Sequence, residues 1–400
     1  METKLDSRQL TFIVILSVAL GIRSLGMSIV APFIANYTIS LKFGTIALSG
    51  IALGAFSLTQ AFFQVPFGKW CDEHGNKRMI LIGLFVLIFG LLLSALSSNA
   101  YMFIFSRFLQ GTGAITAGVY SWISKTVGDE KRADAMGLSS LITSSFSAVA
   151  LGGGPLLIML WNVHELYGIA TVLVIIVFFA ILFLLKDDRD TKKVKLSHEE
   201  VQEIAKESRA YLFSKLKSPK FLGFCFIGFL TLFMFMGDFI ILPEYADKLV
   251  GEVNLWMIFT PSMLIGLITM KLSVKLIKKS YTKEVSLFAG VLFILGNLII
   301  LISHKSLPLL ILASIFSFTA YFVLVNLVPT ITNQIANPQF RGSLNGIVNA
   351  FTYIGGFIGS AIIGMLWGIN PFYATVLVVI LSIVIIVLSI IAVPRVKFGQ

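Results

Sequence analysis

Long apolar runs constrain this chain more than any other feature of its sequence. Twelve of them hold about 20 mostly apolar residues or more, the length that an α-helix needs to cross a bilayer. They show too few period-two alternations for barrel strands, so they predict an all-α integral membrane protein with twelve transmembrane helices. The runs lie at 10–35, 45–67, 79–97, 100–121, 136–160, 166–185, 221–243, 254–274, 284–303, 307–330, 343–367 and 371–393.

The two halves of the chain repeat each other. Residues 26–35 match residues 237–246, and residues 129–137 match residues 338–346, at offsets of 211 and 209 residues. Each match lies at the edge of an apolar run. Duplicated sets of spanning helices are typical of secondary transporters. The repeat therefore predicts two pseudo-symmetric six-helix bundles that enclose one central cavity and rock about it.

The only long polar stretch of the sequence separates the two halves. We expect an N-terminal six-helix bundle at 1–185, a cytoplasmic basic linker at 186–220 and a C-terminal six-helix bundle at 221–400. Within the linker, Ser197 and Glu200 have the spacing of a helix N-cap and its partner. This spacing predicts a short surface helix.

The net charge of +11 indicates topology. Of the 31 lysines and arginines, 26 lie in the termini and in one alternate set of loops. The opposite loops carry only Lys42, Lys248 and Lys305. Positive loops stay in the cytoplasm, so both termini are predicted on the inner side of a plasma membrane. Because the charge follows the loops of an otherwise apolar chain, it does not indicate nucleic-acid binding.

The sequence shows no sign of enzymatic chemistry. Cys71 and Cys225 are far apart, with neither metal-ligand spacing nor the pattern of a disulfide framework. The four histidines are too sparse for a metal cluster, and no nucleotide-binding loop is present. We therefore expect no cofactor, no metal and no covalent step.

The loop between the second and third runs carries the most specific motif. It resembles the loop signature of the major facilitator superfamily, in which glycine, aspartate, glycine and a basic pair recur at fixed spacing. The family usually has a basic residue where this chain has Glu73. The resemblance implies a latch that holds the two halves in the outward-facing state, and an ordinary charged loop is the alternative. The matching residues are Gly68, Asp72, Gly75, Lys77 and Arg78.

Related signatures follow the fourth and tenth runs. Asp129 and Arg132 belong to the first of them, and Arg341 belongs to the second. By the same resemblance, we expect these residues at a cytoplasmic gate, where the arginines pair with Asp72 or Asp129 when that side closes.

Two arginines lie inside apolar runs, where a cation must face protein or water. Arg107 begins the sequence Arg-x-x-Gln-Gly-x-Gly, which resembles a pattern of proton-coupled members. The resemblance implies that Arg107 modulates a titrating carboxylate, and a structural tie to backbone carbonyls is the alternative. Arg23 precedes Gly26 and Pro32, as in the first span of some drug:proton antiporters, and it either faces the cavity or reaches toward an interface.

Asp238 is the one carboxylate that lies well inside an apolar run, and it occupies the duplicate position of Met27. Such a group is a natural site for binding and releasing a proton during transport. The alternative is a hydrated carboxylate at the outer mouth, paired with Lys248 or Arg23. With Arg107 and Arg23, Asp238 forms the predicted proton-coupling set.

Glycines and prolines mark the expected helix bends and close helix contacts. The Gly154-Pro155 pair partly matches an antiporter motif of the fifth span, although the flanking glycines are shifted here. The set comprises Gly26, Pro32, Gly111, Gly154, Pro155, Gly237 and Pro243.

A sparse group of polar and aromatic residues is expected to line the cavity. These surroundings suit a lipophilic or amphipathic substrate better than a sugar, whose hydroxyls all need partners. The candidates are Asn36, Tyr37, Gln60, Gln64, Tyr120, Asn297, Tyr321, Asn326, Asn349 and Tyr353.

The resemblance covers essentially the whole chain and implies the drug:proton antiporter branch of the superfamily. The leading expectation is a monomeric secondary transporter that works by alternating access and exports a lipophilic or amphipathic small molecule in exchange for protons. One alternative is uptake or uniport of an organic anion through an arginine-lined cavity. A more remote one is a membrane sensor that binds its ligand without moving it.

Overall fold

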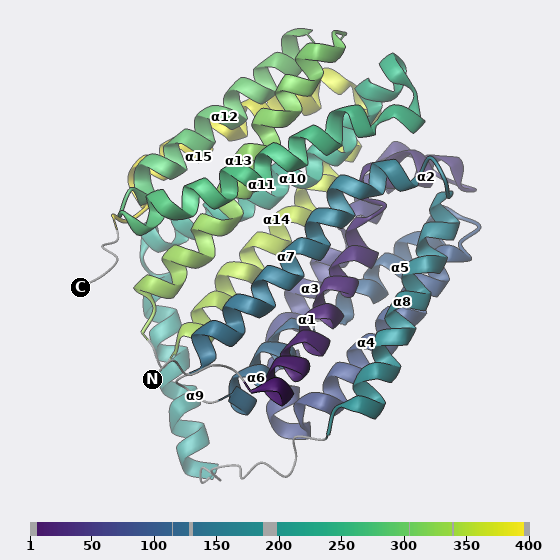
Figure 1. Cartoon of the computed structure of the whole chain (residues 1–400). Coiled ribbons are helices and arrows are strands. Elements are labelled where there is room, and N and C mark those ends of the chain that lie inside the picture. Colours follow the sequence, from purple (N-terminus) through teal and green to yellow (C-terminus); the bar gives the residue numbers. More distant parts are fainter. Residues whose placement is uncertain are drawn as a thin grey trace. The chain divides into compact units, whose positions relative to one another are not determined.

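The computed structural model describes residues 6–113, 115–127, 131–186, 198–303, 305–337 and 340–395. They form two compact units, Met1–Thr191 (unit 1) and Lys192–Gln400 (unit 2). Across these ranges every regular element is a helix, and one isolated bridge joins Lys42 and Asn99 (Figure 1). The all-α prediction is confirmed.

In unit 1 three pairs of helices make the most extensive contacts: α1 with α7, α3 with α5 and α4 with α8. The elements are α1 (Ser7–Ser28), η1 (Ala31–Phe33), α2 (Ile34–Ser40), α3 (Ile46–His74), α4 (Asn76–Ala95), α5 (Ala100–Thr112), α6 (Thr116–Val127), α7 (Arg132–Leu157) and α8 (Val163–Leu184).

Unit 2 repeats these pairings: α10 packs against α14, α11 against α13 and α12 against α15. Its elements are α9 (His198–Leu216), α10 (Pro219–Val250), η3 (Glu252–Asn254), α11 (Trp256–Lys278), α12 (Thr282–Ser303), α13 (Leu307–Ile335), α14 (Arg341–Ile369) and α15 (Pro371–Ala392). The corresponding helices take corresponding partners, as a duplicated bundle requires. Helix α9 occupies part of the polar stretch between the halves, and its expected cap Ser197 lies outside the described residues.

Eleven helical stretches of the described residues are long and apolar enough to cross a membrane. The remaining expected span is the fourth along the chain, 100–121. The sequence predicts one continuous run there, but the structure divides it into α5 and α6, with a break at Gly113. A Cβ at Gly113 would lie 2.6 Å from the carbonyl oxygen of Gly83, so the chain passes closely over α4 at this point. Helix α1 is interrupted in a similar way before Pro32, which cannot donate a backbone hydrogen bond.

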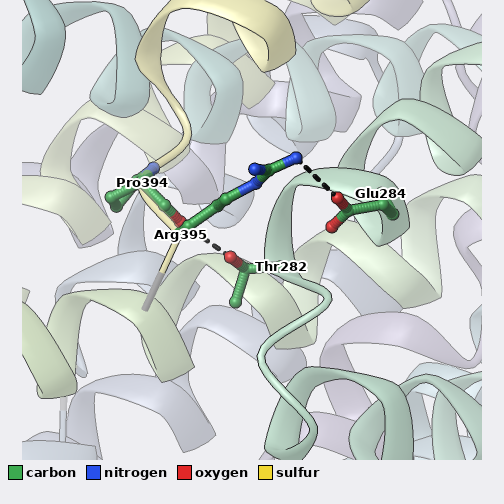
Figure 2. Close-up of polar contacts among 4 residues, drawn as sticks. All are labelled: Thr282, Glu284, Pro394 and Arg395. Atoms are coloured by element: carbon green, nitrogen blue, oxygen red, sulfur yellow. Dashed lines mark hydrogen bonds and ion pairs between the residues drawn. The ribbon is translucent and has the colours of Figure 1, made fainter. Parts of the chain in front are cut away.

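A hydrogen bond and an ion pair connect the segment after α15 to the start of α12. The Thr282 hydroxyl donates to the carbonyl oxygen of Pro394 at 2.7 Å, and Arg395 forms an ion pair with Glu284 at 3.2 Å (Figure 2). Deeper in the bundle, Asn297 donates through Nδ2 to the Ser382 hydroxyl at 3.2 Å. These contacts fix where the chain leaves the bundle after α15.

Candidate functional site

Arg107 is completely buried on α5. Its Nε donates to the carbonyl oxygen of Ala52 at 3.3 Å, and its Nη1 donates to the carbonyl oxygen of Met27 at 3.4 Å and to Gln110 Oε1 at 2.7 Å. The guanidinium also lies 4.9 Å from the centre of the Phe56 ring, which adds a cation–π contact. One side chain thus links α5 to α1 and α3.

A hydrogen-bonded network continues from Gln110 through unit 1. Gln110 Nε2 donates to the Ser94 hydroxyl at 2.7 Å, and the Ser97 hydroxyl donates to the Ser94 carbonyl oxygen at 2.8 Å. The Tyr37 hydroxyl lies 2.9 Å from Ser97 Oγ and 3.2 Å from His164 Nδ1. The network therefore joins α5, α4, α2 and α8, and it includes Tyr37, which we expected in the cavity.

Sequence reasoning missed Ser94, Ser97 and His164. A serine within an apolar run is a weak signal, because its hydroxyl can bond to a carbonyl of its own helix. His164 lies at the start of α8, in a segment whose only visible sequence feature is a helix cap.

Arg23 stabilises the break in the fourth span. Its Nε donates to the carbonyl oxygen of Gly113 at 2.9 Å, and its Nη2 donates to Gln60 Oε1 at 3.3 Å. The last carbonyls of a helix have no partner within the helix, and one that is buried needs a donor from elsewhere. Arg23, itself only 5% exposed, supplies such a donor from α1, beside the Ile115 N–H that donates to the same oxygen at 2.8 Å.

Asp238 lies in the middle of α10 and is only 1% exposed. Neither of its carboxylate oxygens has a hydrogen-bond donor among the described residues. The following residue, Phe239, packs against the rings of Phe259 and Phe318, with centroid distances of 5.6 and 5.7 Å. Asp238 is therefore a buried carboxylate on a stretch of α10 whose neighbour in sequence packs against aromatic rings.

A cavity of about 130 Å³ lies between α10, α13 and α14 of unit 2. Three of the residues expected to line a substrate cavity meet there: Tyr321, Asn349 and Tyr353. Thr231 lines it from α10, seven residues before Asp238 and on the same face of the helix. Seven residues span about 10 Å along a helix axis, so Asp238 lies about two turns beyond this cavity.

The other cavity candidates are dispersed. Asn297 on α12 is hydrogen-bonded to Ser382 on α15. Asn326 is half-buried on α13, and its amide nitrogen has no hydrogen-bond partner among the described residues. Asn36, Gln64 and Tyr120 are half-buried on α2, α3 and α6 of unit 1.

A comparison with known protein families identifies the family of this chain. Residues 16–360 match the family model of the Major Facilitator Superfamily. The chain belongs to the major facilitator superfamily. It is an integral membrane transporter and not an enzyme, in line with the transporter names of its relatives.

Several proteins of this superfamily are similar along most of the chain. The inner membrane transport protein YajR of Escherichia coli (strain K12) is 27% identical over 373 residues, covering 90% of this chain and 79% of that protein. Multidrug resistance protein 2 of Bacillus subtilis (strain 168) is 24% identical over 388 residues, covering 93% and 92%. A solved structure of a bacterial homologue of the human lysosomal transporter Spinster, inward-facing and occupied, has a TM-score of 0.78 at 12% identity and covers 97% of each chain. That likeness confirms the fold.

The superfamily loop joins α3 to α4. Gly75 ends α3 with a φ of 91°, a conformation that glycine adopts without strain. Lys77 donates through Nζ to the carbonyl oxygens of Leu182 and Leu185, so its charge meets the negative end of α8. Arg78 is exposed.

Other residues of the expected latch and gate are only partly described. The backbone of Gly68 and Asp72 belongs to α3 and that of Arg132 to α7. The side chains of Asp72 and Arg132 lie outside what the structure describes, as does Asp129 as a whole. Arg341 is exposed at the start of α14. The latch and the gate stay predictions.

Two of the expected packing glycines lie where the backbone of another helix comes very close. A Cβ at Gly111 would meet the carbonyl oxygen of Phe56, and one at Gly154 would meet the carbonyl oxygen of Ile29. The neighbours of Gly26 and Gly237 are side chains, at 3.4 and 3.1 Å from a built Cβ. Pro32 lies within the 3₁₀ turn η1, and Pro155 and Pro243 lie inside α7 and α10.

The same substitution should change stability in opposite directions at two glycines of α7. Gly154→Ala places a methyl group against the backbone at Ile29 and should destabilise the protein by about 1–3 kcal/mol. Gly137→Ala meets no atom within 4 Å and should stabilise the helix by about 0.5–1 kcal/mol. Melting temperatures of the two purified variants in one detergent check this, and equal shifts would contradict the close approach at Gly154.

Proposed function

We propose that this transporter exports lipophilic or amphipathic small molecules in exchange for protons, and that Asp238 takes up and releases the proton. The observation that carries the proposal is the burial of this carboxylate without a hydrogen-bond donor among the described residues. An isolated charge in such a place is costly, and the group accepts a proton instead. An ionisable residue within a membrane span is a functional candidate for this reason.

The surroundings of Asp238 support a lipophilic substrate. Phe235, one turn before it, stacks on Tyr321 with a centroid distance of 3.5 Å, and Tyr321 lines the cavity between α10, α13 and α14. Aromatic faces with few polar groups bind apolar or amphipathic compounds, because few polar groups of the cavity then lose a hydrogen-bond partner. A relative that is 24% identical is named a multidrug resistance protein, which agrees with this substrate class.

The geometry favours export over arginine-based uptake of an anion. Arg107 donates through Nε and Nη1 to two backbone carbonyls and Gln110, and Arg23 donates through Nε and Nη2 to Gly113 and Gln60. Both side chains are buried, so a substrate anion would have to reach guanidinium groups that are already hydrogen-bonded inside unit 1. In the proposed cycle of alternating access, an external proton loads Asp238, and substrate competes with the proton or follows its release on the inner side.

The proposal is tested in inside-out vesicles that hold an imposed proton gradient and a pH-sensitive dye. Lipophilic cations, neutral lipophilic compounds and organic anions are added in turn, and vesicles without the transporter provide the background. We expect proton efflux on addition of cations or neutral compounds. A response to organic anions alone would overturn the proposal in favour of uptake.

A further inference from the structure

A second, larger hollow lies in unit 2 where α9 meets α10. It has a volume of about 580 Å³ and is enclosed by the end of α9, the start of α10 and the ends of α13 and α15. We name it the α9–α10 pocket. Its lining residues are Ser214, Lys215, Ser218, Lys220, Phe221, Phe224, Ile335, Ile391, Ala392, Val393 and Pro394.

The lining of the α9–α10 pocket combines a cationic part with a largely apolar part. Lys215 and Lys220 contribute two cations, and the lining contains no acidic residue to neutralise them. The rest of the wall is largely apolar, with Phe221 and Phe224 buried on the first turns of α10. A cationic rim over an apolar floor fits a ligand that is anionic at one end and apolar at the other.

The walls of the pocket are held by contacts outside it. Asn337, after α13, donates its backbone N–H to the Tyr211 hydroxyl at 3.1 Å, which holds α9 in place. Thr282 and Glu284 hold Pro394 and Arg395 at the end of α15 (Figure 2). These contacts fix two of the segments that line the pocket.

The surrounding surface has the character of a membrane interface. Phe213 is 63% exposed on α9, and the Lys217 ammonium lies 5.0 Å from the centre of its ring. Helix α10, which enters the apolar core, begins two residues after Lys217. The distribution of lysine and arginine along the chain predicts that this end faces the cytoplasm, where the membrane surface carries anionic lipids.

We propose that the α9–α10 pocket binds an anionic phospholipid of the cytoplasmic leaflet. Its phosphate lies between Lys215 and Lys220, and an acyl chain follows Phe221, Phe224 and Ile391 toward the apolar core. Basic pockets between spanning helices on this side of a membrane bind such headgroups. The site is separate from the proposed proton-coupling carboxylate and does not depend on the proposed export activity.

The test measures lipid retained by the full purified protein, by native mass spectrometry in detergent titrated with phosphatidylglycerol or phosphatidylcholine of identical acyl chains. We expect preferential binding of phosphatidylglycerol. The double substitution Lys215→Gln and Lys220→Gln should weaken this binding roughly tenfold or more, because these two lysines line the pocket and supply the cations that meet the phosphate. Ser214→Trp, which fills the pocket, should reduce binding of both lipids.

Lys217→Gln is the matched control, since this lysine lies at the same helix end but does not line the pocket. It should leave binding unchanged. Equal binding of the two lipids by the native protein would overturn the proposal, and so would an equal loss in the Lys217 variant. Inorganic phosphate that displaces the lipid at millimolar concentration would identify a site for a free anion instead. Melting temperatures show whether each variant is folded. If Ser214→Trp does not fold, the lysine pair still tests the proposal, because Lys215 is half-buried and Lys220 is exposed.

Discussion

Asp238→Asn should abolish substrate-driven proton movement while leaving the protein folded. The asparagine has nearly the same shape but cannot take up and release a proton, so coupling should fall to the background of vesicles without transporter. Because neither carboxylate oxygen accepts a hydrogen bond within the described part of the chain, the exchange removes no bond that is seen there. The measurement is the dye response in inside-out vesicles, with the melting temperature of the purified variant recorded beside it.

Asp247→Asn is the matched control, because Asp247 is an exposed carboxylate near the end of the same helix. It should retain full coupling. Asp238→Glu keeps a titrating group and should retain part of the activity, with an altered dependence on external pH. Full coupling in the Asp238→Asn variant would place the proton site elsewhere. Export of substrate without any proton movement would show a transporter that uses another driving force.

Arg107→Ala should cause the largest loss of stability expected for a single substitution in unit 1. It removes the donor from two backbone carbonyls and from Gln110, and leaves these buried groups without that partner. Hydrogen bonds to a charged group are worth about 1.5–3 kcal/mol each, and a buried acceptor left without its donor costs about 1–3 kcal/mol. We expect a loss in that range, measured as a lowered melting temperature in detergent.

Arg78→Ala is the control for Arg107→Ala, since Arg78 is exposed at the start of α4 and should be neutral to stability. Arg107→Lys keeps the charge but not the planar fork, and should lie between the native protein and the alanine variant. A normal melting temperature in Arg107→Ala would mean that the bonds to α1 and α3 contribute little. If Arg107→Lys is folded and its coupling has an altered pH dependence, Arg107 also tunes a titrating group, as its sequence motif implies.

The spanning helices could be predicted from the sequence because helix formation in a bilayer is a local requirement. Every backbone N–H and C=O must be satisfied within its own segment, so a run of about 20 apolar residues is sufficient to define a helix. The duplication of 26–35 at 237–246 also predicted the matching helix pairs of the two units. The same local reasoning failed at 100–121, where hydropathy is continuous but the helix breaks at Gly113.

The sequence by itself determined that this is a duplicated bundle of membrane helices, with its arginines and Asp238 marked as exceptional residues. Only the tertiary structure decided what those residues contact. Arg23 of α1 donates to the carbonyl oxygen of Gly113, where the fourth span breaks, and Tyr37 of α2 contacts His164 of α8. Such contacts depend on the rotation and depth of each helix, which are set by backbone approaches such as those at Gly111 and Gly154. No pattern within one helix contains that information.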